Sequence, residues 1–135
     1  MRINKEERKK YKNIIKKIRK KLDESPLNYF IKNYYYSLKE SELPSAKINV
    51  INRIKTNKIA LTKFKDNLNS GVENDVYNET IEEKIYDLQY QNNTAKEIIK
   101  FINLRKNEFY YEKKLKNELN FFKKILNCRR LFSGF

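Results

Sequence analysis

Apolar residues recur at helical spacing along most of the chain, and this pattern predicts an all-α protein. In residues 5–22, the positions Ile14, Ile15, Ile18 and Leu22 form a narrow stripe on a helix that is otherwise cationic. Because the stripe is thin, we expect this helix to need RNA or a partner to stay ordered. The predicted fold class is all-α, with extended helices, a central antiparallel helical hairpin and a long C-terminal helix.

The first arm of the hairpin follows a cap signal. Ser25 precedes Pro26, which is the order expected for an N-cap followed by proline at the first helical position. Apolar residues of the 27–38 segment then recur at i, i+3/i+4 and i+7 spacing. Leu43-Pro44 is expected to end this helix.

The second arm is predicted to begin at Ser45 and to end before Gly71, where a C-terminal glycine cap belongs. Because the link between the arms is short and contains proline, they should fold back on each other as an antiparallel pair. The predicted seam of the second arm, with one polar position, consists of Val50, Ile54, Asn57, Leu61, Phe64 and Leu68.

Residues 72–79 are polar and acidic and are expected to form a loop. Thr80 with Glu83, and Thr94 with Glu97, each fit the Thr-x-x-Glu capping box, so a short helix and then a long one are predicted. In the long helix, the apolar stripe changes register between Phe109 and Leu115. The predicted organisation is a basic N-terminal helix, a hairpin, an acidic loop with a short helix, and a long basic helix ending in a tail, over residues 1–24, 25–71, 72–93 and 94–135.

The formal net charge of the 135 residues is +14, and it is unevenly distributed. Residues 1–22 carry +9 and residues 96–130 carry +7, whereas residues 72–92 carry −5. Basic arms of this kind attract polyanions through phosphate contacts and counterion release. A genome rich in A and T would favour the codons of asparagine and isoleucine and so explain why these residues are frequent. It would not explain 31 basic residues against 17 acidic ones.

Composition also limits the kinds of catalytic or metal chemistry that the chain can perform and the cellular compartments that it suits. The chain has no histidine, one cysteine (Cys128) and two glycines, so we expect no enzyme activity, no metal site and no cofactor. We also expect no small-molecule substrate. No stretch approaches the roughly 18 apolar residues of a membrane span, and the N-terminus lacks a secretory signal. A cytoplasmic protein with no membrane partner is therefore predicted.

Aromatic runs are weaker candidates for nucleic-acid contact than basic ones. Consecutive residues of Tyr34-Tyr35-Tyr36 point in different directions on a helix, so Tyr34 and Tyr35 are expected to pack in the hairpin and Tyr36 to be partly exposed. The basic residues predicted to contact RNA are Lys9, Lys10, Lys12, Lys16, Lys17, Arg19, Lys20, Lys21, Lys113, Lys114, Arg129 and Arg130.

Two stretches resemble the universal large-subunit ribosomal protein family numbered twenty-nine, called L thirty-five in older eukaryotic usage. Residues 47–53 read Lys-Ile-Asn-Val-Ile-Asn-Arg, where eukaryotic members have Lys-Ile-Arg-Val-Val-Arg-Lys. Residues 87–89 read Asp-Leu-Gln and residues 94–96 read Thr-Ala-Lys, similar to the Asp-Leu-Arg and Thr-Arg-Ala of that family. The chain departs from the family at Asn49 and Asn52, which replace arginines, and at residues 97–100, where an arginine-rich run is expected.

The resemblance implies a helical hairpin and a scaffold role near the peptide exit of the large ribosomal subunit. It implies that Lys47 and Arg53 contact rRNA, with Asn52 a weaker candidate. The partners expected on this view are rRNA or another structured RNA and neighbouring ribosomal proteins.

The predicted function is therefore that of a structural RNA-binding protein, most specifically a component of the large ribosomal subunit. The alternative is a helical, coiled-coil-like adaptor, or a viral or phage inhibitor, that acts through protein contacts at positions such as Leu119 and Phe122. A membrane-surface helix is disfavoured because the chain has no tryptophan and the apolar stripe of the first helix is thin.

Overall fold

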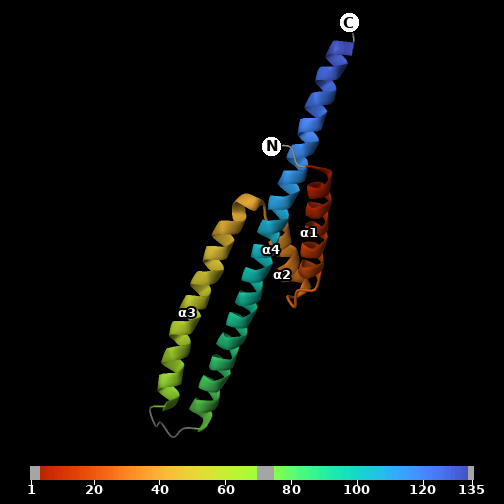
Figure 1. Ribbon diagram of the computed structural model, residues 1–135. Coiled ribbons are helices and arrows are strands. Elements are labelled where there is room, and N and C mark those ends of the chain that lie inside the picture. Colours follow the sequence, from red (N-terminus) through yellow and green to blue (C-terminus); the bar gives the residue numbers. More distant parts are fainter. Residues whose placement is uncertain (1–3, 70–74, 134–135) are drawn as a thin grey trace. The chain divides into compact units, whose positions relative to one another are not determined.

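The computed structural model describes residues 4–69 and 75–133, and the side chains of residues 4–68 and 78–117. Its elements are α1 (Lys5–Asp23), α2 (Tyr29–Ser37), the 3₁₀ turn η1 (Glu40–Glu42), α3 (Leu43–Asn69) and α4 (Asp75–Ser133) (Figure 1). Every regular element in the described part is helical, which confirms the all-α prediction.

The chain divides into two compact units, and each contains one part of α4. The first unit consists of Met1–Glu24 and Leu104–Phe135, and the second of Ser25–Asn103.

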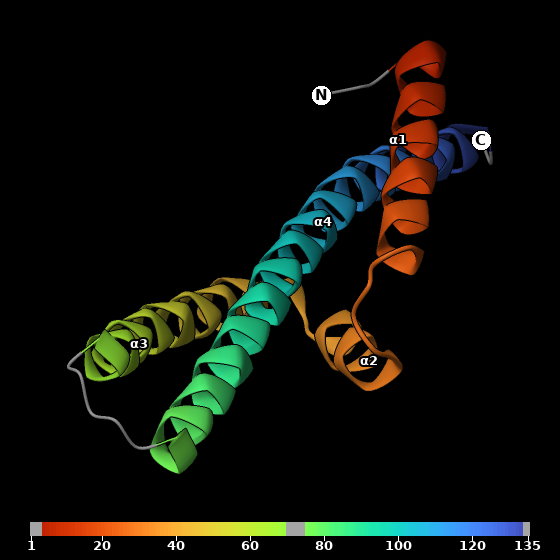
Figure 2. The ribbon, with the colours of Figure 1, turned by 90° about the horizontal axis from the view of Figure 1, so that it is seen from below.

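In the first unit, α1 packs against the C-terminal part of α4 (Figures 1 and 2). The side chain of Asn4 caps α1 by accepting a hydrogen bond from the amide of Glu7 at 2.7 Å. Ile15, Ile18 and Leu22 are buried, so the thin apolar stripe of α1 is covered within the chain itself. The two helices run antiparallel, because the Tyr11 ring lies 5.5 Å from that of Tyr111, while later residues of α1 reach earlier residues of α4.

In the second unit, α2 begins later than the sequence suggests. The cap is Asn28, whose side-chain oxygen accepts from the amide of Ile31 at 2.9 Å, and the predicted cap at Ser25 is wrong. Ser25 instead accepts from the amide of Leu27 at 3.4 Å in the preceding turn, and Leu27 is buried. An Asx cap at the helix start satisfies an amide that Ser25 is too far away to reach.

The link between α2 and α3 also differs from expectation. α2 ends at Ser37, and η1 leads directly into α3 at Leu43, so Leu43-Pro44 starts a helix and does not end one. Proline is tolerated in a first helical turn because the amides there have no intrahelical acceptor. Leu43 is among the most deeply buried side chains described, which fixes this helix start.

The long antiparallel partner of α3 is the N-terminal part of α4, and not the 27–38 segment (Figure 1). The side chain of Asn57 donates to that of Asn92 at 3.0 Å, and Lys84 lies over the Phe64 ring at 5.5 Å. The nine residues of α2 are too few to cover the 27 residues of α3. As predicted, Asn57 occupies a buried position in line with Val50 and Ile54.

α4 is one continuous helix of 59 residues, so the predicted helix starts at Thr80 and Thr94 are wrong. The tail predicted for residues 131–135 is helical as far as Ser133. Both threonines lie inside the helix because no glycine or proline occurs between residues 75 and 133 to break it. The polar run at 91–93 is helical, and the side chain of Asn92 accepts a hydrogen bond from that of Asn57. The predicted loop over 72–79 is wrong from Asp75 on, because α4 begins there, and Gly71 and residues 72–74 lie outside the described residues.

The buried face of α4 includes charged residues. Its buried positions recur at three- or four-residue spacing through Ala95, Ile98 and Ile102, and then through Arg105 and Glu108. The apparent change of register after Phe109 arises because these two charged side chains occupy buried positions that an apolar pattern cannot show.

Candidate nucleic-acid interface

The predicted basic residues of α1 form two stripes on its exposed surface. One stripe, Lys9, Lys12, Lys16 and Lys20, recurs at three- or four-residue intervals. The second consists of Lys10, Lys17 and Lys21, and all seven side chains are exposed. These stripes lie away from the buried stripe of α1, so the helix is cationic on one side and apolar on the other.

Few of these lysines are neutralised within the chain. Among the described residues, Lys20 pairs with Glu24 at 3.9 Å, and the other six have no carboxylate within ion-pair distance. Opposite charges on the same helix face would have indicated a self-paired, solvated surface. We call the seven side chains Lys9, Lys10, Lys12, Lys16, Lys17, Lys20 and Lys21 the α1 lysine face.

Arg19, which the sequence also predicts to contact RNA, is occupied by carboxylates of α4. Its Nε donates to Glu108 Oε2 at 3.4 Å, and its Nη2 donates to Glu112 Oε1 at 3.0 Å. Glu108 is fully buried and also accepts from Arg105, whose guanidinium lies 4.3 Å from the Phe109 ring. Arg19 therefore holds α1 against α4, a role for which sequence reasoning has no signal because its partners lie about ninety residues away.

Lys114 is likewise engaged within the first unit. Its ammonium lies 5.2 Å from the centre of the Tyr11 ring and 4.7 Å from that of Tyr110. A hydrogen bond to the Tyr110 side chain raises the pKa of Lys114 above its ordinary value of 10.5; desolvation opposes this rise, and Tyr11 adds to it. Lys113 is exposed.

A recess of about 340 Å³ lies between α1 and α4 in the first unit, and its lining includes a lysine that is not among the predicted RNA contacts. Ile15 and Leu115 provide apolar lining, and Lys12, Lys16 and Lys116 provide cations. Lys116 belongs to the same basic run as Lys113 and Lys114, but only the packing of α4 against α1 places it beside Lys12 and Lys16.

The residues suggested by the ribosomal resemblance lie on α3, in the second unit. Lys47 is half-buried, whereas Asn52 and Arg53 are exposed. The side chains of Arg129 and Arg130 lie outside the described residues, as do those of Leu119, Phe122 and Cys128.

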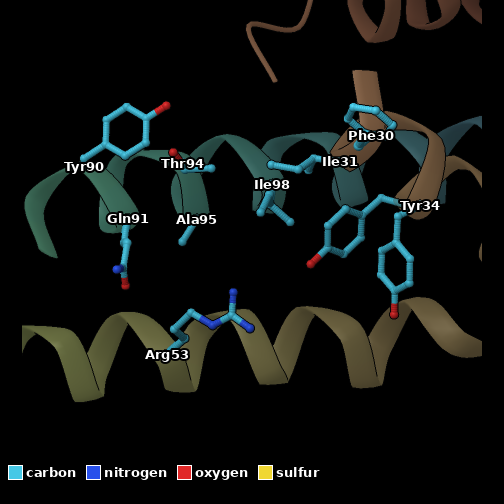
Figure 3. Close-up of a pocket in the computed structure, with 10 residues that line it drawn as sticks. Phe30, Ile31, Tyr34, Arg53, Tyr90, Gln91, Thr94, Ala95 and Ile98 are labelled. Atoms are coloured by element: carbon cyan, nitrogen blue, oxygen red, sulfur yellow. The ribbon is translucent and has the colours of Figure 1, made fainter. Parts of the chain in front are cut away.

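Arg53 borders a pocket of about 490 Å³ that is formed by α2, α3 and α4 (Figure 3). Gln91, Ala95 and Ile98 point from α4 toward α3, and Arg53 points from α3 toward α4. We call this the α2–α4 pocket; its residues are Phe30, Ile31, Tyr34, Tyr35, Arg53, Tyr90, Gln91, Thr94, Ala95 and Ile98.

The tyrosine run of α2 differs from the expected packing. Tyr34 is 61% exposed, so the prediction that it packs in the hairpin is wrong, whereas Tyr35 is half-buried and Tyr36 is exposed. The rings of Tyr34 and Tyr35 meet edge to face at 5.0 Å. Burial raises the pKa of the Tyr35 phenol above its ordinary value of 10.0, partly offset by Arg53 and reinforced by Tyr34.

The described residues contain neither a cluster of metal ligands nor a membrane-spanning helix. No group of three or more His, Cys, Asp or Glu side chains in this part of the chain is placed to hold a metal ion. None of the helices, over the residues the structure describes, is both long and apolar enough to cross a membrane.

Comparison with protein-family models, with curated proteins and with solved structures found no significant match to this chain. The resemblance to the large-subunit ribosomal family therefore rests on its short sequence motifs alone.

Proposed function

We propose that this protein is a structural RNA-binding protein whose α1 lysine face lies along the phosphate backbone of a folded RNA. The observation that supports this most directly is the surplus of cations on one helix face. Six of its seven lysines have no carboxylate partner within the described residues, while the opposite side of α1 is buried on α4. Lysines presented on a packed helix bind phosphates at less conformational cost than those on a free arm.

The recognition would be of shape and charge. From Lys9 to Lys20 the first stripe extends about 16 Å along the helix axis, which allows several phosphates to be contacted at once. Contacts of this kind fix position and orientation but carry little base identity. The proposed role is structural, and no reaction is assigned to the chain.

The setting we propose is the large ribosomal subunit, on the strength of the family resemblance at residues 47–53, 87–89 and 94–96. In that setting neighbouring ribosomal proteins would cover exposed apolar side chains. Sedimentation at low salt tests this: the protein should co-sediment with the large subunit, and its absence from the large-subunit fraction would contradict a ribosomal component.

The RNA-binding proposal is tested by replacing Lys16, Lys17, Lys20 and Lys21 together with glutamine, which keeps helix propensity and removes four charges. Affinity for a structured RNA should fall steeply. The salt slope should shrink by about 0.7–0.9 for each phosphate that the variant no longer neutralises, with no change in sequence preference.

The matched control removes the same charge from α3, by glutamine at the exposed residues Lys55, Lys58, Lys63 and Lys65. An equal loss of affinity in both variants would mean that net charge, and not the α1 lysine face, determines binding. Deletion of residues 1–22 is a poorer test, because it also removes Ile15, Ile18 and Leu22 from the packing of the first unit.

A helical adaptor is the second candidate, and exposed aliphatic side chains on α3 favour it. Ile48 and Ile59 are both more than half exposed, and such residues gain nothing from phosphate contact. For an adaptor, Ile48→Gln with Ile59→Gln should disrupt a co-purifying protein complex that the α1 lysine variant leaves intact. The reverse result would favour RNA.

A further inference from the structure

The α2–α4 pocket has walls that differ in chemistry. Phe30 and Tyr34 of α2 and Tyr90 of α4 are 81%, 61% and 65% exposed, so their ring faces are available to a ligand. Ile31, Ala95 and Ile98 supply apolar lining, and the last two are buried. A volume of about 490 Å³ falls within the range of roughly 300–1,000 Å³ that is usual for ligand sites.

The charge in this pocket has one sign. Arg53 is the only charged residue among its ten lining residues, and it points into the space between α3 and α4 (Figure 3). A guanidinium is suited to a phosphate, because its planar fork donates two parallel hydrogen bonds. Gln91 and Thr94 add side-chain donors and acceptors beside it.

One aromatic ring of the pocket is partly fixed before any ligand arrives. Tyr34 lies edge to face against the half-buried Tyr35 at 5.0 Å, whereas Phe30 contacts the exposed ring of Tyr29 at 5.9 Å. A ring already held by its neighbours loses less conformational freedom when a ligand stacks on it.

We propose that the α2–α4 pocket binds one unpaired nucleotide of an RNA chain, with the base stacked on one of the exposed aromatic rings that line the pocket and the phosphate on Arg53. Stacking on aromatic side chains and pairing with arginine is how proteins hold unstacked bases. A base inside a duplex could not enter this recess between three helices, so the nucleotide must come from a bulge or loop.

This inference rests on the proposed RNA-binding function and deepens it. It assigns to the second unit the recognition of an unpaired base, whereas the α1 lysine face of the first unit contacts phosphates. It also gives Arg53 a partner on grounds independent of the ribosomal resemblance.

The test uses the full chain and two RNAs that share one duplex, of which only one carries a single-nucleotide bulge. The wild type should bind the bulged RNA more tightly. Tyr90→Ala and Arg53→Gln should each weaken that binding by about tenfold and change duplex binding less than twofold. The matched controls are Tyr86→Ala, an equally exposed tyrosine of α4 outside the pocket, and Lys55→Gln on α3.

A second measurement needs no variant. A 4-thiouridine at the bulge of the RNA should photocrosslink to peptides that contain Tyr34 or Tyr90. Crosslinking confined to other peptides would overturn the pocket assignment, as would an equal loss of affinity for both RNAs in the pocket variants.

The two proposals fail in different ways. Salt-dependent binding of both RNAs with no preference for the bulge would overturn the pocket proposal but would not contradict RNA binding by the α1 lysine face. No binding of either RNA would overturn both. Saturable binding of an acidic, phenylalanine-containing peptide that is lost in Arg53→Gln, without any effect of the bulge, would reassign the pocket to a protein ligand.

Discussion

Arg19 of α1 reaches across to Glu108 of α4 and donates to its Oε2 at 3.4 Å, although Glu108 is completely buried. The same carboxylate accepts from Arg105, so it is shared between two guanidinium groups from two helices. A buried charge is tolerated only when it is paired and hydrogen-bonded. α1 must therefore pack in the first unit so that Arg19 reaches the Glu108 carboxylate.

Glu108→Gln should therefore lower the free energy of unfolding by about 3–5 kcal/mol, because it leaves buried Arg105 facing a neutral amide. Glu112→Gln, which alters the more exposed partner of Arg19, should cost only about 0–1 kcal/mol. Urea denaturation followed by circular dichroism measures both. Similar small losses in the two variants would contradict a structural role for the Glu108 cluster.

The seam of α3 gives a second stability prediction. Ile54→Ala should cost about 2–5 kcal/mol, because Ile54 is only 9% exposed on the face that includes Asn57. Ile59→Ala is the control on the same helix, and it should stay within about 0.5 kcal/mol because Ile59 is 61% exposed. Comparable losses at both positions in thermal or urea unfolding would show that the opposite face is also covered.

The amide pair between α3 and α4 is best tested by a double-mutant cycle. Asn57→Leu should cost about 1–3 kcal/mol, because it leaves the buried amide of Asn92 without its partner. Adding Asn92→Leu should restore much of the stability, since replacing both partners by apolar groups is close to neutral. If the double variant loses the sum of the single ones, the two amides are not coupled.

Alkaline pH should lower the free energy of unfolding, partly through ionisation of Tyr35. Its pKa is raised in the folded state, so the folded chain holds that proton more tightly than the unfolded chain does. The resulting stability is complete below about pH 10 and is lost as pH rises through the folded pKa. The urea midpoint of the wild type should therefore fall between pH 8 and a pH above 10, and this fall should be smaller in Tyr35→Phe. Tyr29→Phe, on the same helix, is the control for loss of a hydroxyl.

Sequence periodicity predicts the helices themselves better than their ends and partners. The apolar stripes of residues 5–22 and 45–68 locate α1 and α3, and Asn57 lies on the buried face as predicted. The predicted starts at Thr80 and Thr94 are wrong because a capping-box pattern also occurs inside helices, where nothing forces the chain to break. The predicted start of α2 is wrong because Asn28 competes better for the cap than Ser25 does.

Of the two candidate sites, one can be predicted from the sequence and the other depends on how the helices pack. Basic runs are visible in sequence, so the α1 lysine face can be predicted, but the engagement of Arg19 with Glu108 depends on long-range packing. The α2–α4 pocket cannot be predicted, because Phe30, Arg53 and Tyr90 come from three helices and no local spacing relates them. The expectation that Tyr34 packs is wrong because a nine-residue helix leaves much of its surface uncovered.

That uncovered helix has a consequence for the pocket it helps to form. None of the nine residues of α2 is buried, and it is held mainly by half-buried Ile31 and Tyr35 and by the buried Leu27 before it. Segments with so little buried apolar surface open locally at a lower free energy than the whole protein. The amide hydrogens of α2 should accordingly exchange with deuterium sooner than those around Ile54, and a ligand that stacks on Phe30 or Tyr34 should slow this exchange by keeping the helix closed.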